Sequence, residues 1–397
     1  MPEAVIVDAI RTPIGRAVKG SLKSLRADDL AAIPLRALIE RNPQLEQSTI
    51  GDVMMGCGYG EGEQGYNVGR IALLLAGIDH HVPGTTVNRF CASSLQTTRM
   101  AFHAIKAGEG DTYIAAGVEA VSRTGRGSSS FELNPKLDGS PGSLYDAYIS
   151  MGMTAENVAE RCKVSREAQD EWALISQTRA VAAVESGHFE REIVPVTVPA
   201  HTDTDKEGNE VEVPEALVSK DDGPRPGTTM EKLAALQPVF KEGGTVTAGN
   251  ACPLNDGAAA LLVMSDERAR ELGLKPRARI IASSVAAIRP EIMGLGPIPA
   301  IQKVLAATGM TIDDVDVVEI NEAFAAQIVP CKEELGIDEQ KLNPFGGAIA
   351  LGHPFGMTGA RIMTTLLNDL ETLDATYGLE SMCVAGGMGM AMLVERL

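Results

Sequence analysis

The sequence predicts an α/β protein, and two features of its pattern support this class. Runs rich in Val, Ile and Ala that favour strands alternate with runs of helical periodicity in the first quarter of the chain, and a second alternating series begins near Arg279. The 41 glycines and few aromatic residues are typical of a fold with many tight turns. Such alternation indicates helices layered on sheets.

Each series supplies several elements. In the first series we expect strands at 4–9, 52–55, 84–87 and 112–117, and helices at 30–39, 66–75 and 93–107. In the second we expect strands at 279–283, 315–319 and 382–386, and helices at 300–307, 323–335 and 359–370.

The two series share faint local similarity, which predicts an internal duplication. Residues 114–118 align with 384–388, and residues 90–95 align loosely with 355–360. In this alignment a glycine of the second copy stands opposite Cys91 of the first.

The sequence between the two series differs from both. From about 122 to 244 it is polar and rich in Gly, Ser and Pro around one long amphipathic stretch, 155–185. The acidic, Pro-bounded segment 201–215 predicts an exposed hairpin or loop. This region is either an insertion that covers an active site or a decoration of an exposed edge.

Length and charge limit the function. A chain of 397 residues suggests two or three domains, or two fused similar halves. The net charge of −18 argues against a nucleic-acid partner, so an anionic ligand would need a local basic patch or helix N-termini. No secretory signal or membrane-spanning run is seen, and we expect a cytoplasmic protein.

The six cysteines are widely spaced. None forms a C-x-x-C pair or has a histidine at ligand spacing, so neither a disulfide framework nor a metal site is expected: Cys57, Cys91, Cys162, Cys252, Cys331 and Cys383.

Cys91 lies where a β-branched strand turns into a helix. The unpaired N–H groups and positive dipole end of a helix N-terminus stabilise a thiolate. Taken alone, a reactive cysteine and a buried structural cysteine are equally good interpretations.

Three further segments carry polar groups suited to chemistry. His353 stands in a rigid loop rich in Gly and Pro, which favours acid/base work over an ordinary surface position. Cys383 precedes a glycine-rich turn. Asn321 follows a strand and opens a helix, at the sheet edge where α/β ligand sites form.

Together these four segments resemble the thiolase family, over nearly the whole chain from Arg11 to the glycine-rich tail. The segments 245–250 and 321–324 add to the resemblance. It implies two similar βαβαβαββ halves in five layers, α-β-α-β-α, with an inserted loop domain. The implied divisions are 1–121 plus 245–272, 122–244 and 273–397.

The resemblance also implies residue roles. Cys91 would be the acylated nucleophile, His353 the base that takes its proton, and Cys383 the acid/base for the departing enolate and the incoming CoA. His353 and a water held by Asn321 would stabilise one oxyanion, and the backbone N–H groups of Cys91 and Ala385 a second one. The family often has glycine where this chain has Ala385.

Coenzyme A is the implied substrate, with no permanently bound cofactor. Arg225 matches a family arginine near the nucleotide, Lys232 would add charge or be a solvated surface residue, and Cys252 replaces a common serine. Residues expected near the substrate also include Met151, Met293 and Phe324. A homodimer or homotetramer is implied, with the strand 84–87 pairing across a two-fold axis.

The resemblance favours the degradative 3-ketoacyl-CoA branch, as in fatty-acid β-oxidation, because Ser150 replaces a histidine typical of short-chain biosynthetic thiolases. The main alternative is an acetyl-CoA acetyltransferase that makes acetoacetyl-CoA, and a remote one is a non-catalytic thiolase-like lipid carrier. Residues 60–65 also satisfy the dinucleotide motif G-x-G-x-x-G, but Glu61 and Glu63 would repel a pyrophosphate.

Overall fold

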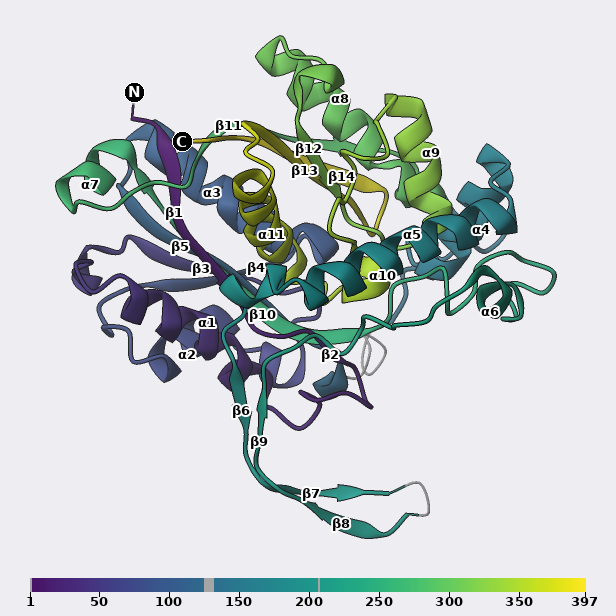
Figure 1. The fold of residues 1–397 in the computed structure, drawn as a ribbon, viewed down its shortest axis with the longest axis horizontal. Helices are drawn as coiled ribbons and strands as arrows, with labels where there is room; N and C mark the ends of the chain where they lie inside the picture. Colours follow the sequence, from purple (N-terminus) through teal and green to yellow (C-terminus); the bar gives the residue numbers. More distant parts are fainter. Residues whose placement is uncertain (1, 125–131, 206–207) are drawn as a thin grey trace.

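The computed structural model describes residues 2–124, 132–205 and 208–397, and its ribbon is shown in Figure 1. The strands are β1 Ala4–Arg11, β2 Gly15–Arg16, β3 Asp52–Gly56, β4 Gly84–Val87, β5 Thr112–Ala120, β6 Val196–Val198, β7 His201–Thr204, β8 Glu210–Val213, β9 Ala216–Val218, β10 Asn255–Ser265, β11 Ala278–Ala287, β12 Val317–Ile320, β13 Tyr377–Val384 and β14 Met388–Arg396. The helices are α1 Ala27–Arg41, α2 Val68–Leu75, α3 Ser93–Ala107, α4 Met151–Cys162, α5 Arg166–Glu185, α6 Met230–Ala234, α7 Asp266–Glu271, α8 Pro297–Thr308, α9 Ala325–Leu335, α10 Ala348–Leu351 and α11 Thr358–Thr372.

Two mixed half-sheets meet along one narrow seam. The strand order is β12-β13-β14-β11-β1-β10-β5-β3-β4, and β1 joins β11 only through Val5 opposite Arg279 and Ile6 opposite Ala278. The pairs β3–β4, β3–β5 and β12–β13 are parallel. Outward from the seam, the order β1-β10-β5-β3 of the first half corresponds to the order β11-β14-β13-β12 of the second.

The fold has five layers, α-β-α-β-α, of which helices form three (Figure 1). Helices α3 and α11 lie between the half-sheets, α1 and α2 lie outside the first, and α8 and α9 lie outside the second. The strands bury both faces. On β13, for example, Met382 packs into the middle layer, whereas Leu379 and Cys383 pack outward beneath α8 and α9. This period of two explains why the strands read as continuous apolar runs.

The predicted duplication is visible as a constant offset. The elements β12, α11 and β13 begin at 317, 358 and 377, each 265 residues after β3, α3 and β5 at 52, 93 and 112. The predicted alignment of 90–95 with 355–360 has this offset. The predicted alignment of 114–118 with 384–388 is wrong by five residues, because 385–387 form the turn between β13 and β14.

Most predicted elements occur, and β4 and α3 have the expected bounds. The long strands β10 and β14 were not predicted. The stretch 155–185 is not one helix: Lys163 adopts a left-handed φ of 57° that ends α4, and Ser165 Oγ accepts the Ala168 N–H to start α5. Of the loops predicted from 122 onward, 125–131 lie outside the described residues.

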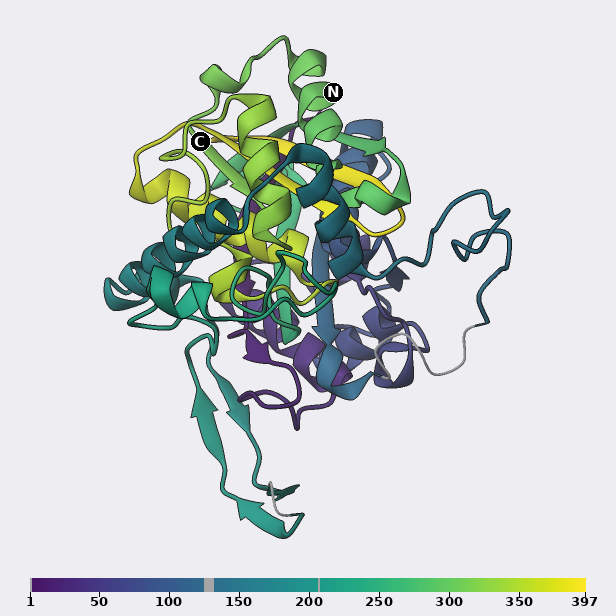
Figure 2. The same ribbon diagram turned by 90° about the vertical axis from the view of Figure 1, so that its right-hand side faces the viewer.

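The predicted hairpin at 201–215 is confirmed in its described part by the pairing of β7 with β8. Together with β6 and β9 it forms an arm that projects far from the body (Figure 2). Near its base, the buried Arg11 pairs with Glu192 at 2.6 Å and with Asp221 at 2.7 Å, which ties the inserted segment to β1. In the described part of the chain, no helix combines the length and apolar character needed to cross a membrane.

Candidate active site

Cys91 lies at the elbow between β4 and α3, in a 3₁₀ turn formed by Phe90–Ala92. Phe90 has a left-handed φ of 45°, a strained conformation for an aromatic residue. Its N–H donates to Asn88 Oδ1 at 2.8 Å, and Ser93 Oγ donates to its carbonyl at 2.6 Å. The flanking side chains thus hold the strained elbow that presents Cys91.

The Cys91 thiol faces backbone donors. The N–H groups of Ala385 and of Cys91 itself lie close enough to its sulfur to stabilise a thiolate. Burial raises the pKa of Cys91 to about 12, partly offset by these two donors. The thiol therefore keeps its proton in the free protein, while donors for a developing negative charge are already in place.

Ala385 is positioned by a tight turn between β13 and β14. Gly386 and Gly387 follow it with φ values of 79° and 81°, which only glycine adopts without strain. A side chain at Gly387 would also collide with the carbonyl of Ile288. The glycine-rich turn is thus required to aim the Ala385 N–H at Cys91.

His353 has one ring nitrogen engaged and one free. Its Nδ1 lies 2.6 Å from Thr358 Oγ1, and this hydroxyl donates to the Pro354 carbonyl at 2.8 Å. Because the single hydroxyl proton goes to that carbonyl, His353 Nδ1 must carry the hydrogen, and Nε2 has the lone pair. Nε2 is buried and has no hydrogen-bond partner among the residues that the structure describes. Burial lowers the pKa of His353 to about 3, with a smaller contribution from Arg361.

Glu119, at the end of β5, joins the loops around the site. Its carboxylate accepts the N–H groups of Gly58 at 2.8 Å, Tyr59 at 3.2 Å and Gly356 at 2.9 Å, and the Gln64 amide at 2.6 Å. Burial raises the pKa of Glu119, and these four donors oppose the shift. One side chain thereby fixes the loop after β3 and the elbow that precedes α11.

Asn321 and Cys383 lie at the neighbouring ends of β12 and β13. The strands are parallel with Ile320 opposite Ser381, and the Asn321 N–H donates to the Ser381 carbonyl at 2.9 Å. Both amide atoms of the Asn321 side chain are buried, and neither has a hydrogen-bond partner in the described part of the chain. Burial, and then the nearby Cys91, raise the pKa of Cys383 well above its usual value. The structure therefore brings both cysteines together beside an amide that has unused hydrogen-bonding capacity.

Glu322 fixes the loop that leads to His353. It accepts hydrogen bonds from Trp172 Nε1 at 3.1 Å, Ser176 Oγ at 2.6 Å, Asn343 Nδ2 at 2.8 Å and the Ile349 N–H at 3.1 Å. The inserted helix α5 is thus tied to the site through a buried carboxylate.

A basic cavity of about 290 Å³ opens beside this cluster. Its lining includes three cationic side chains, Arg16, Arg225 and Lys232, and no carboxylate from the described residues. Burial and then the charge of Arg16 lower the pKa of Arg225. Ala251 and Pro253 also line the cavity and flank Cys252, whose thiol interacts electrostatically with Cys91. The cavity is therefore a cationic space next to Cys252 in sequence, and Cys91, His353 and Cys383 are not among its lining residues.

The apolar residues that the sequence placed near the substrate pack around Cys383. Met293 and Phe324 are buried in the same core cluster as Cys383, and Met151 packs against that cluster. The Ala251–Phe324 bridge and the bond from the Cys252 N–H to the Ala323 carbonyl bring Cys252 beside them.

Two family models match consecutive parts of the chain. The model of the thiolase N-terminal domain matches residues 4–267, and that of the thiolase C-terminal domain matches residues 274–396. The chain belongs to the thiolase family.

Known relatives align with this thiolase along its whole length. A beta-ketoadipyl-CoA thiolase of Acinetobacter baylyi is 48% identical, with all of both chains covered. A 3-oxoadipyl-CoA/3-oxo-5,6-dehydrosuberyl-CoA thiolase of Escherichia coli is 47% identical, and a 3-ketoacyl-CoA thiolase of Cronobacter sakazakii is 46% identical, again with complete coverage of both chains.

The solved structure of the Bacillus anthracis acetyl-CoA acetyltransferase superimposes with a TM-score of 0.88 at 40% identity, covering 100% of this chain and 99% of that one. This thiolase is therefore a CoA acyltransferase with the thiolase fold, as the sequence resemblance predicted.

Several residues that shape the site were not singled out from the sequence. They are Arg16, Glu119, Asn255 and Thr358. A carboxylate within the otherwise apolar run that forms β5 was a usable signal for Glu119. Asn255, whose Oδ1 accepts the His353 N–H at 2.9 Å, had none, because this contact joins residues 98 positions apart.

Proposed function

We propose that this thiolase cleaves 3-ketoacyl-CoA with CoA, giving acetyl-CoA and an acyl-CoA shortened by two carbons. The observation that carries the proposal is the buried Cys91 thiol under the N–H groups of Cys91 and Ala385. A nucleophile seated against preorganised donors suits acyl transfer through a covalent thioester.

In the first half-reaction, Cys91 attacks the C3 carbonyl carbon of the substrate while His353 Nε2 accepts the thiol proton. The C2–C3 bond breaks, its electron pair forms the enolate of acetyl-CoA, and the Cys383 thiol protonates C2. Because His353 is a weak base and the Cys91 thiol a weak acid in the free protein, proton transfer is coupled to the attack.

In the second half-reaction, the Cys383 thiolate takes the proton of the CoA thiol, and the CoA sulfur attacks the acyl carbon on Cys91. Acyl-CoA leaves, and the Cys91 thiolate recovers its proton from His353. The N–H groups of Cys91 and Ala385 stabilise the tetrahedral oxyanion at the acyl carbon. A water held by Asn321, together with His353, stabilises the thioester oxygen of the enolate, which agrees with the unpartnered amide of Asn321.

Mass spectrometry after incubation with an acyl-CoA tests this scheme. We expect one acyl group on the Cys91 peptide and none in Cys91→Ser, whereas Cys383→Ala should acylate Cys91 but lose carbon–carbon bond cleavage. Unchanged acylation in Cys91→Ser, or wild-type turnover in Cys383→Ala, contradicts the assigned roles.

For the substrate, we propose the degradative branch and take 3-oxoadipyl-CoA as the first compound to test. Relatives named for this substrate share 47–48% identity over the whole chain, and Ser150 stands where biosynthetic thiolases tend to have histidine. The alternative within this branch is a thiolase of fatty-acid β-oxidation, which acts on unbranched acyl chains. It agrees with the name of the Cronobacter relative, a 3-ketoacyl-CoA thiolase.

Thiolysis rates with 3-oxoadipyl-CoA and 3-oxohexanoyl-CoA separate these two, because the substrates differ only at the terminal carboxylate. Preference for the first supports the dicarboxylic substrate. Adding acetoacetyl-CoA tests the second candidate function, an acetyl-CoA acetyltransferase, which the similarity to the Bacillus anthracis structure favours. Each further CH₂ of the acyl chain that the enzyme buries contributes about 0.8 kcal/mol to binding, so the two chain lengths should differ measurably in kcat/KM. Thiolysis of acetoacetyl-CoA alone would support the acetyltransferase.

We further propose that the chain divides at 1–121 plus 245–272, 122–244 and 273–397, and that it acts in the cytoplasm as at least a homodimer. β4 supports the dimer: it is the terminal strand of the sheet order, and Tyr66 and Phe90 near it are exposed. Light scattering at micromolar concentration should give at least twice the chain mass of 41.8 kDa.

A further inference from the structure

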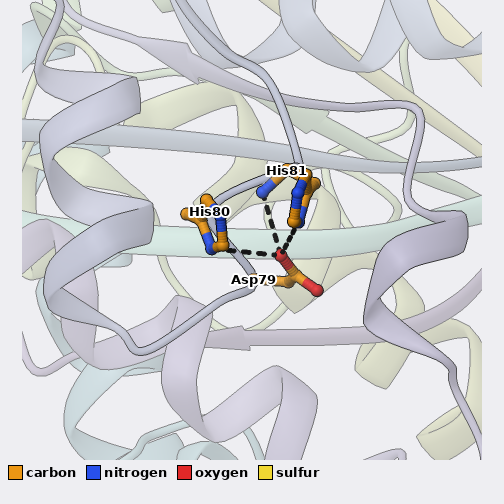
Figure 3. A group of neighbouring side chains, drawn as sticks. All are labelled: Asp79, His80 and His81. Carbon is orange, nitrogen blue, oxygen red and sulfur yellow. Dashed lines mark hydrogen bonds and ion pairs between the residues drawn. The ribbon is translucent and has the colours of Figure 1, made fainter.

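Outside the proposed mechanism, the turn between α2 and β4 carries three adjacent metal-ligating side chains, Asp79, His80 and His81 (Figure 3). They are the one such group of three in the part of the chain that the structure describes. We propose that this turn is a binding site for a zinc-class divalent cation, with one carboxylate and two imidazole ligands.

The donor atoms converge on one point. His81 Nδ1 lies 2.9 Å and His80 Nδ1 3.6 Å from Asp79 Oδ1, and the ligand atoms all lie within 4.8 Å of one another. Ligands at a zinc distance of about 2.0–2.1 Å with tetrahedral angles are separated by about 3.3 Å. The two separations from Asp79 Oδ1 bracket this value, and the two imidazole nitrogens lie within 4.8 Å of each other, so side-chain rotations can bring all three onto one ion.

The backbone of the turn is fixed independently of the three ligands. Arg70 on α2 donates through Nη2 to the His80 carbonyl at 2.9 Å and through Nη1 to the Val82 carbonyl at 2.5 Å. Gln47 Oε1 accepts the Asp79 N–H at 3.0 Å, and the Val82 N–H closes the turn on the Asp79 carbonyl at 2.9 Å. A held backbone reduces the conformational entropy that metal binding has to overcome.

The charge and exposure of the group also suit a cation. The group combines a carboxylate with two imidazoles, which are ligand types that zinc-class cations bind. The His80 and His81 side chains are 75% and 74% exposed, so a cation can enter and keep a water in the fourth position. Coordination through Nδ1 requires the His81 tautomer that carries its ring hydrogen on Nε2.

Titration calorimetry with Zn²⁺ on the full-length protein tests the site. We expect one ion per chain, and a loss of affinity in His80→Ala, His81→Ala and Asp79→Asn of at least about 10-fold, because losing even an outer partner of a metal ligand costs 10- to 100-fold. His201→Ala, which removes a partly exposed histidine on the distant arm, is the matched control and should bind like the wild type.

The variants also serve a stability test. Zinc should raise the melting temperature of the wild type and of His201→Ala, but not that of His80→Ala or His81→Ala. Since His80 makes the longer of the two contacts to Asp79, His80→Ala remains informative if His81→Ala folds poorly. The proposal is overturned if the wild type shows no saturable one-to-one binding. It is equally overturned if His80→Ala keeps the wild-type affinity, which would indicate zinc on a thiol elsewhere.

Discussion

His353 Nδ1 lies 2.6 Å from Thr358 Oγ1, and the same hydroxyl donates to the carbonyl of Pro354. Thr358 thus fixes both the orientation and the tautomer of the imidazole, leaving the Nε2 lone pair free inside the site. In Thr358→Val the Nδ1–H loses its acceptor, at a cost of about 1–3 kcal/mol for an unsatisfied buried group. We expect the rate of Cys91 acylation by acetyl-CoA, measured by stopped-flow, to fall by about 10- to 100-fold. The KM for CoA in steady-state thiolysis should stay unchanged. Thr358→Ser should stay close to wild type, and equal rates in Thr358→Val would exclude the positioning role.

Glu119 should matter for both stability and turnover, although it is placed outside the reacting groups. It accepts four N–H donors from loops that hold the two elbows. In Glu119→Gln the new amide NH₂ faces donors, so we expect the free energy of unfolding in urea to fall by about 1–3 kcal/mol together with the acylation rate. Glu63→Gln, which removes a more exposed carboxylate, should change acylation little. A Glu119→Gln enzyme with wild-type rate and stability would contradict this prediction.

Arg16 and Arg225 should bind phosphate groups of CoA. Both line the basic cavity, in which no described carboxylate competes with an anion. A hydrogen bond to a charged group contributes about 1.5–3 kcal/mol, so Arg16→Gln and Arg225→Gln should each raise KM for CoA by about 10- to 100-fold with little change in kcat. With a pantetheine thiol acceptor, which lacks the nucleotide phosphates, both variants should match the wild type. A similar loss with pantetheine would show that the arginines act on the fold instead.

Acid should weaken the fold through buried neutral histidines. The pKa of His353 is lowered from 6.5 to about 3, and burial lowers that of His188 to about 4. Below pH 6.5 the unfolded chain binds protons that the native chain does not, so stability present above pH 6.5 is lost as the pH falls toward these values. At pH 5 the His353 contribution amounts to about 2 kcal/mol. The free energy of unfolding in urea should be measured at pH 8 and at pH 5. Its loss between these pH values should be smaller than in the wild type by this amount in His353→Asn, and unchanged in His201→Asn.

Much of this arrangement followed from local patterns. The elbow at Cys91 was predicted because a β-branched strand and an amphipathic helix meet there, and β4 and α3 have the predicted bounds. The glycines after Cys383 predicted a tight turn, and both adopt positive φ values. The family resemblance supplied the residue roles, which the proposed acylation and thiolysis experiments now test.

What was missed depends on long-range contacts or on single residues. The break between α4 and α5 rests on the left-handed Lys163 and the cap of Ser165, which an amphipathic average over 155–185 conceals. The five-residue error in the repeat arose because small residues recur both within β5 and in the turn after β13. Arg16 joins the cavity only through folding, since more than 200 residues separate it from Arg225.

The repeat offset of 265 residues places Gly356 at the position equivalent to Cys91, and this bears on whether one chain can hold a second nucleophile. Gly356 occupies the elbow equivalent to that of Cys91, and a side chain there would collide with the carbonyl of Val118; one at Gly117 would collide with the carbonyl of Gly356. The second elbow and β5 thus pack too closely for a side chain at Gly356. In the proposed mechanism, duplication therefore gives a division of labour and not a second catalytic centre: one copy presents the sulfur that is acylated, and the other carries His353 and Cys383, which move the protons.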